Sequence, residues 1–226
     1  MRRLRSALTI LACLTAVAAQ AAVDVPICYN YGCVTEAVVR FPEDDLLSLQ
    51  RQLRAATSAA EERAIVAEVI GWMYREAGRQ SPIHADRGGN FADEGVDGRM
   101  DCIDHANSTT RLLGVLEARG ALRFHKLMPQ ARRTTVVLFQ HFGAVLEEIA
   151  PPPPPVSPAV VPDHVPVLLA LCDCVEVLDD VPAPPPVAGG SPGARFAVDT
   201  WFYDHGRPAV ILPLAEWLDG EGPNVQ

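Results

Sequence analysis

The chain has 226 residues, of which 49% are apolar and 21% are charged, so it can bury the core of one ordinary domain. Its formal net charge of −9 at pH 7 argues against a protein that binds nucleic acid by neutralising phosphates. Beyond the first 21 residues no apolar run reaches the roughly 18 residues of a membrane-spanning helix, so no transmembrane segment is expected.

Residues 1–21 are predicted to form a secretory signal peptide. Three arginines lie among the first five residues, and an almost wholly apolar stretch runs from Leu8 to Ala19. Ala19 and Ala21 form the small-x-small pattern that precedes a cleavage site. We therefore expect a mature chain of residues 22–226 that is periplasmic or secreted.

The cysteines remaining after that cleavage fall into two close groups and one isolated residue. Cys28 and Cys33 form the first group, Cys172 and Cys174 form the second, and Cys102 stands alone. Thiols pair in oxidising compartments, and an odd number leaves at least one unpaired. We expect two disulfides among the four grouped cysteines, in a pairing that spacing does not fix, and a free thiol at Cys102. A zinc site built from the same four residues is the alternative.

The first half of the mature chain is predicted to be mainly helical. Acidic residues directly after Pro42 favour the start of a helix, and Ser58 and Glu61 form a capping box that opens another. The expected elements are, in chain order, an irregular or strand-like entry (23–39), a helix (42–56), a helix from Ser58 onward, a Gly- and Asp-rich loop (80–101) and a helix (103–119) that ends at Gly120.

The second half is predicted to form an antiparallel sheet interrupted by a proline-rich insertion. Thirteen of the 20 prolines fall between Pro151 and Pro192, so an extended insertion is expected at about 151–192, with an apolar island (167–178) that could add an edge strand. The expected elements are strands at 122–128, 134–149, 195–203 and 209–214, and a short helix at 214–218. Helices followed by such a sheet indicate a single α+β domain over residues 22–226.

Three residues in this arrangement suggest nucleophilic catalysis. Cys102 lies where the loop enters a helix, and a helix N-terminus is expected to lower the pKa of a thiol. Asp199 interrupts an apolar strand, where a carboxylate is costly unless it is paired, and His141 on a neighbouring strand would pair it. The set provides a nucleophile, a base and a carboxylate that orients the base.

These residues also carry a resemblance to a known family. The segments concerned are Asp-Cys-Ile-Asp-His-Ala (101–106), His141 with Ala-Val-Leu after two intervening residues (144–146), and Ala-Val-Asp (197–199). Together they resemble the bacterial transglutaminase-like cysteine proteinases. The resemblance implies a papain-like core with Cys102 as nucleophile, His141 as base and Asp199 as orienting acid. It implies attack on a peptide amide and a thioester intermediate, with hydrolysis favoured over transfer to an amine.

Other assignments complete the sequence-based hypothesis. The backbone N–H of Cys102 is one expected oxyanion donor, and Asn90 is a candidate for the second. His125 is the reserve base. No metal or other cofactor is expected, although the oxygen-rich loop 86–97 could bind calcium. The expected partner is a peptide or protein substrate in the cell envelope; the alternative is a non-catalytic envelope protein that uses the same fold for binding or scaffolding.

Overall fold

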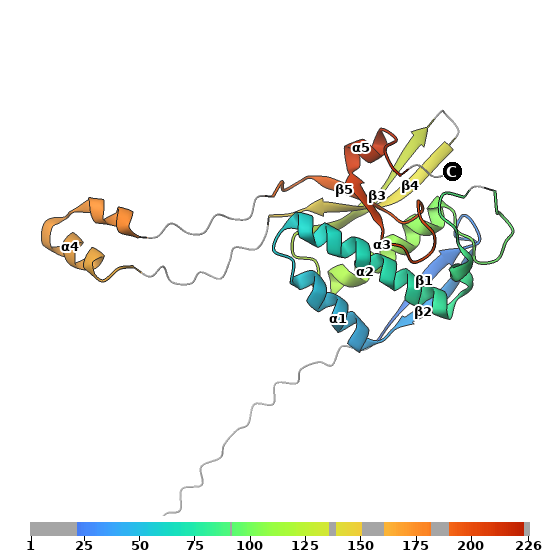
Figure 1. Ribbon diagram of the computed structural model, residues 1–226, viewed down its shortest axis with the longest axis horizontal. Helices are drawn as coiled ribbons and strands as arrows, with labels where there is room; N and C mark the ends of the chain where they lie inside the picture. Colours follow the sequence, from blue (N-terminus) through green and yellow to red (C-terminus); the bar gives the residue numbers. More distant parts are fainter. Residues whose placement is uncertain (1–21, 91, 136–138, 151–160, 182–189, 224–226) are drawn as a thin grey trace, which may run out of the picture.

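The structure, a computed structural model, describes residues 22–90, 92–135, 139–150, 161–181 and 190–223. The predicted signal peptide lies outside these ranges. The described part is a mixed α+β protein, as expected, with helices packed on antiparallel sheets (Figure 1). Within it, no helix is both long and apolar enough to cross a membrane.

The entry segment forms a two-stranded hairpin. Strand β1 (Val23–Tyr29) pairs antiparallel with β2 (Thr35–Phe41). Ile27, Val39 and Phe41 are fully buried, while alternate residues of β2 are exposed. This period-two pattern fixes which face of the hairpin packs on the helices.

Helices α1 (Glu43–Arg54) and α2 (Ala59–Gln80) begin where the sequence predicts them. The first turn of α1 is acidic and its last turn basic, which suits the helix dipole. At α2, the Ser58 side chain accepts a hydrogen bond from the Glu61 N–H, and the Glu61 carboxylate reaches back to Thr57. A short 3-10 helix, η1 (Pro82–Ala85), follows α2.

Helix α3 (Cys102–Ala118) begins at the cysteine itself, one residue earlier than predicted. Asp101 is its N-cap and Asp104 completes a capping box. Leu112, Leu113 and Leu116 are buried against α2, β1 and the main sheet, so this helix is the centre of the core.

The main sheet is antiparallel, in the order β3-β4-β5-β6. Its strands are β3 (His125–Thr135), β4 (Phe139–Glu148), β5 (Arg195–Asp199) and β6 (Val210–Pro213), followed by helix α5 (Leu214–Leu218). The predicted single strand over 134–149 is wrong, because its first residues end β3 and the rest form β4. No Gly, Pro, Asn or Asp lies between residues 134 and 142 to signal a turn.

The two faces of the sheet have different neighbours. Ala144, Leu146 and Val198 belong to the core cluster that also contains the buried residues of α2 and α3. Because side chains alternate along a strand, His141 and Asp199 point to the opposite face. That face is covered by α5, and Figure 1 shows α5 and α3 on different sides of the sheet.

The insertion contains a helix where an edge strand was expected. Helix α4 (His164–Cys172) is followed by the 3-10 helix η2 (Val175–Asp180), and Figure 1 shows the pair apart from the rest of the protein. The run from Val165 to Leu171 is apolar without a clear period, and such a run does not distinguish a strand from a helix. The edge-strand prediction for 167–178 is therefore wrong.

Among the described residues, two disulfides and one free cysteine are present. The bonds join Cys28 to Cys33 and Cys172 to Cys174, and Cys102 is free. The alternative of one zinc site from all four grouped cysteines does not fit, because their sulfurs are already bonded in pairs and a zinc ligand is a thiolate.

Candidate functional site

The thiol of Cys102 lies against strand β4. Its Sγ atom is 3.6 Å from the carbonyl oxygen of Gln140, and the backbone N–H of Phe142 is near enough to lower the pKa of the thiol. These two backbone groups flank His141 in the chain. The thiol is half-buried, so it is not sealed in the core.

The thiol can contact the edge of β4 because β5 is shorter than β4 and leaves part of that edge unpaired. Glu148 donates its backbone N–H to the carbonyl oxygen of Ala194, and Ala144 pairs with Val198. The backbone N–H and C=O groups of the even-numbered residues of β4 therefore point toward the β5 edge of the strand. Alternate residues of an antiparallel strand direct their backbone groups to the same edge. Gln140 and Phe142 therefore face a part of that edge beyond the end of β5 at Asp199. The sulfur occupies this open edge.

His141 and Asp199 form a close pair on the α5 face. The Nε2 atom of His141 is 2.6 Å from Oδ2 of Asp199, which is buried. The same Oδ2 accepts a hydrogen bond of 2.8 Å from the indole N–H of Trp217, and Oδ1 accepts one of 3.0 Å from the backbone N–H of Trp201. With Nε2 engaged, Nδ1 is the ring nitrogen left to exchange a proton with another group.

Aromatic rings surround this imidazole. The ring of His141 is 4.9 Å from that of Trp201, 5.5 Å from that of Trp217 and 5.8 Å from that of Phe202, measured between centroids. Gly143 permits the approach of Trp217, because a Cβ at that position would lie 3.0 Å from the indole ring. No sequence signal pointed to Trp217, since a tryptophan in a short C-terminal helix has no spacing that links it to Asp199.

The pKa of Cys102 differs from the sequence-based expectation. Burial raises the pKa of the thiol to about 11, and the charges of Asp101 and Asp199 add to this, against a lowering by the backbone N–H of Phe142. The expected lowering by the helix N-terminus is therefore outweighed by desolvation and two carboxylates. At neutral pH the resting thiol is protonated, and it needs a base to become a nucleophile.

The reserve base does not join this site. The Nδ1 atom of His125 is 2.8 Å from Oε1 of Glu62, and its Nε2 is 3.1 Å from the guanidinium of Arg63. Its strand partner is Glu148, at the end of β4 remote from His141. His125 belongs to a buried network that connects α2 with the sheet.

The candidate oxyanion residue and the candidate calcium loop are engaged locally. The side-chain oxygen of Asn90 accepts the N–H of Ala92 at 2.9 Å, and its oxyanion role stays a prediction. Asp86 accepts from the Met100 N–H, and Asp97 from the Asn30 side chain. These carboxylates therefore order the loop through one contact within it and one to the turn between β1 and β2, and calcium binding there stays a prediction.

A second His–Asp pair lies one helical turn after Cys102, and the sequence did not suggest it. Nε2 of His105 is 3.1 Å from Oδ2 of Asp86, and Nδ1 is 2.8 Å from the hydroxyl of Thr200. Burial lowers the pKa of His105, but the negative charge of Asp86, 3.1 Å away, outweighs this and the pKa is raised. The pair connects the start of α3 to the residue that follows Asp199.

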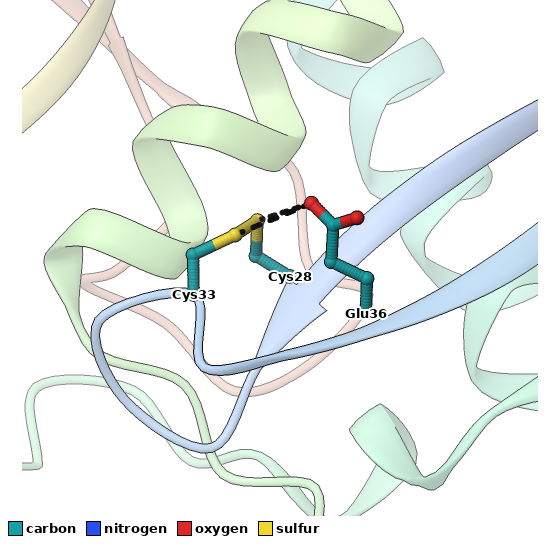
Figure 2. A group of neighbouring side chains, drawn as sticks. All are labelled: Cys28, Cys33 and Glu36. Atoms are coloured by element: carbon teal, nitrogen blue, oxygen red, sulfur yellow. Dashed lines mark hydrogen bonds between the residues drawn. A yellow bond between two sulfur atoms is a disulfide. The ribbon is translucent and has the colours of Figure 1, made fainter.

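A third group of side chains lies at the first disulfide. Figure 2 shows the carboxylate of Glu36 directed at the bonded sulfurs of Cys28 and Cys33, with Oε1 at 3.7 and 3.5 Å. Two sulfurs and a carboxylate within this distance resemble a metal-ligand set. In the disulfide, however, the sulfurs carry no thiolate charge, and thiolates are the form that binds metals.

The structure therefore brings the three predicted catalytic residues to one part of the sheet, the thiol at the edge of β4 and the His–Asp pair on its face. Comparisons with protein-family models, with curated proteins and with solved structures found no match. The function has to be inferred from the site itself.

Proposed function

We propose that this protein is an exported cysteine-dependent hydrolase that cleaves peptide amide bonds, with the papain-like arrangement of the transglutaminase-like enzymes. The main support is that the Cys102 thiol, at the start of α3, lies against β4 beside His141, 3.6 Å from the carbonyl oxygen of Gln140. Asp199 engages Nε2 of the His141 ring, so Nδ1 is the nitrogen that can act as the base.

The proposed reaction begins with proton transfer to Nδ1 of His141. The sulfur of Cys102 attacks the amide carbonyl as it loses its proton, and the imidazolium is stabilised by Asp199 through Nε2. The imidazolium then gives the proton to the leaving amine, and a thioester remains. Water, deprotonated by the same ring, attacks the thioester and restores the thiol.

Backbone amides are available for the developing oxyanion. The N–H of Cys102 is in the first turn of α3, where amides have no partner within the helix. The N–H of Phe142 faces the sulfur from β4. We assign the second oxyanion contact to the N–H of Phe142, because it lies on the strand that the sulfur contacts, and Asn90 stays the alternative donor through its side-chain NH2 group.

A cavity that shares Phe202 with the surroundings of the imidazole suits the substrate chain. Phe202, whose ring contacts that of His141, also lines a cavity of about 390 Å³. Tyr203 and Arg207 line this cavity and a neighbouring one, so the two cavities follow the same exposed surface. We assign this surface to the peptide on one side of the cleaved bond.

The test is a search for new peptide ends. The mature chain is incubated with cell-envelope proteins and cell-wall peptides, and products are identified by mass spectrometry, with a labelled amine present to separate amine transfer from hydrolysis. Cys102→Ala and His141→Gln should each lower cleavage by about 10³-fold or more. His164→Gln changes an exposed histidine on α4 and should leave cleavage unchanged.

Each variant is first checked for a native circular dichroism spectrum and cooperative unfolding. Cleavage that persists in a folded Cys102→Ala protein would contradict the proposal. So would a wild-type chain that neither releases new ends nor forms an acyl adduct at Cys102.

A second candidate function is binding without catalysis. It is favoured by the exposed apolar side chains of α4 and η2 (Val167, Leu168, Leu171, Val175 and Leu178). Segment 151–194 contains five acidic residues and no Lys or Arg, so a partner would present an apolar surface with basic residues around it. Retention of envelope phenotypes by Cys102→Ala would favour this function.

A further inference from the structure

The turn between β1 and β2 has an unusual backbone. Asn30, Tyr31, Gly32 and Cys33 all have positive φ, at 65°, 65°, 66° and 58°. Residues other than glycine rarely adopt this left-handed region, and four in succession need compensating contacts. Successive residues of this kind direct their backbone N–H groups toward one side, where they can bind an anion.

The anions in this case are carboxylates at the start of α3. The N–H groups of Tyr31 and Cys33 donate to the two oxygens of Asp104, at 2.8 and 2.6 Å. The N–H of Gly32 donates to Asp101 at 3.0 Å. The turn therefore binds both carboxylates of the capping box, and Cys102 lies between them in the chain.

The disulfide closes this turn. Cys28, the first residue of the turn, is buried. Its backbone N–H donates a hydrogen bond of 2.9 Å to the hydroxyl of Ser108 on α3. Cys33, the last residue of the turn, is half-buried, so a small reductant can approach its sulfur. Residues 28–33, here called the disulfide turn, thus contact α3 at its first turn and again at Ser108.

We propose that the disulfide turn is a redox-sensitive clamp that holds the first turn of α3, and with it the thiol of Cys102, against β4. Its effect on the position of Cys102 follows from these contacts alone. That it would regulate hydrolysis rests on the proposed function.

The redox step is an exchange with a dithiol. The dithiol gives two electrons and two protons, the Cys28–Cys33 bond breaks into two thiols, and the reductant becomes a disulfide. Without the covalent closure, the left-handed turn loses its constraint, and Asp101 and Asp104 lose the three N–H donors. The first turn of α3 then frays and water reaches Cys102.

The experiment measures alkylation of Cys102 by iodoacetamide at pH 7.5, resolved by peptide mass spectrometry. Cys28→Ser/Cys33→Ser removes the clamp, and Cys172→Ser/Cys174→Ser removes the remote disulfide as a matched control. The first variant should react about tenfold faster than wild type, and the control within about twofold of it. Dithiothreitol should raise the rate of the control variant to that of the first variant.

The expected tenfold increase in the alkylation rate follows from the exposure of the Cys102 thiol to water. Burial, together with the charges of Asp101 and Asp199, raises the pKa of Cys102 from 9.0 to about 11, so complete relief of this shift would give about a hundredfold more thiolate at a fixed neutral pH. A thiolate of lower pKa is intrinsically less nucleophilic, which reduces the gain to about tenfold.

The result does not depend on one variant folding. If Cys28→Ser/Cys33→Ser fails to unfold cooperatively, dithiothreitol added to the control variant opens the same bond in an unaltered turn. Asp104→Asn keeps the disulfide but removes one acceptor oxygen, and should accelerate alkylation several-fold. Hydrogen exchange at residues 102–105 should rise in each case.

Alkylation and exchange that stay within about twofold on reduction would overturn the clamp. This outcome is separate from that of the cleavage test. A protein without hydrolytic activity could still show the change at Cys102, and an active hydrolase could show none.

Discussion

The carboxylate of Asp199 is held in place by individual hydrogen-bond donors, and each of them can be tested by one substitution. It is buried, and the indole of Trp217 supplies one of the hydrogen bonds to Oδ2. Trp217→Phe keeps an aromatic ring but removes that donor. Because a hydrogen bond to a buried charge is lost and a small cavity forms, the free energy of unfolding in urea should fall by about 2–4 kcal/mol.

Trp72→Phe provides the comparison, since it makes the same chemical change on α2, away from Asp199. It should cost about 1 kcal/mol or less, because the ring is only partly buried. Equal losses for the two variants would mean that the bond to Asp199 contributes nothing measurable. If the proposed function holds, only Trp217→Phe should also slow hydrolysis.

The half-buried imidazole of His205 is expected to make the folded protein less stable at acidic pH. Burial lowers its pKa to about 4, and Asp86 opposes this while His105, His84 and Arg75 add to it. The imidazole is near the ring of Tyr74, and its Nε2 would lie 2.3 Å from a Cβ at Gly78. There is little room for the water that a charged ring requires.

The sign of this effect follows from the two protonation states. Between the ordinary pKa of 6.5 and the folded value of about 4, the unfolded chain binds a proton that the folded protein does not. Stability should therefore fall as the pH falls through this window, by about 1–2 kcal/mol after allowing for solvent screening of a partly exposed ring. The free energy of unfolding of His205→Asn, measured in urea, should depend less steeply on pH than that of wild type, whereas His164→Gln, an exposed change on α4, should keep the wild-type dependence.

At the scale of elements, the insertion is the most separable part. It leaves the sheet after β4 and returns at β5, and these strands pair at Glu147 and Arg195. Glu148 holds the return by accepting the backbone N–H groups of Ser191 and Gly193. Both ends of the insertion are therefore adjacent, and a short linker can join them.

Replacing residues 156–189 with a short Gly/Ser linker should leave the free energy of unfolding of the rest unchanged within about 0.5 kcal/mol, measured in urea. Loop-closure entropy changes only slowly with length, and within the described residues α4 packs mainly against η2. A loss of several kcal/mol would show that the insertion packs on the sheet. If the shortened protein lost binding to a partner but still cleaved peptides, binding would be assigned to the insertion and cleavage to the rest of the domain.

The sequence predicted elements best where one local signal decides them. The capping box at Ser58, the acidic turn after Pro42 and the short helix at 214–218 are all present. It failed where the signal is weak or long-range. The turn between β3 and β4 lacks turn-forming residues, and the apolar run at Val167 has no period that separates strand from helix.

Across the whole molecule, the sequence order Cys102, His141, Asp199 led to the prediction that His141 pairs with Asp199 and that Cys102 lies near this pair; the structure shows the pair, and it places the thiol of Cys102 against β4. Their environment was not predictable, because it depends on contacts between distant segments. Burial raises the pKa of Cys102, and the donor at Asp199 comes from α5. The left-handed backbone of the disulfide turn is compensated by Asp104, far along the chain. The spacing of residues within one segment cannot predict contacts of this kind.

The most consequential of these long-range contacts joins the helices to the sheet. Glu62 on α2 is fully buried, and its carboxylate accepts hydrogen bonds from the backbone N–H groups of Arg123 and Phe124 and contacts His125 at 2.8 Å. Arg63 extends the network to Glu148 at 2.9 Å. One carboxylate thus satisfies the backbone at the start of β3.

Removing that carboxylate should affect the entire fold. Glu62→Ala leaves one buried N–H group, one partly buried N–H group and a buried histidine without their acceptor, so the free energy of unfolding should fall by about 3–5 kcal/mol. Glu68→Ala, an exposed change on the same helix, should cost less than about 0.5 kcal/mol. Both are measured by urea unfolding followed by circular dichroism. A loss at Glu62 no larger than that at Glu68 would mean that water replaces the carboxylate, and that apolar packing alone holds α2 to the sheet.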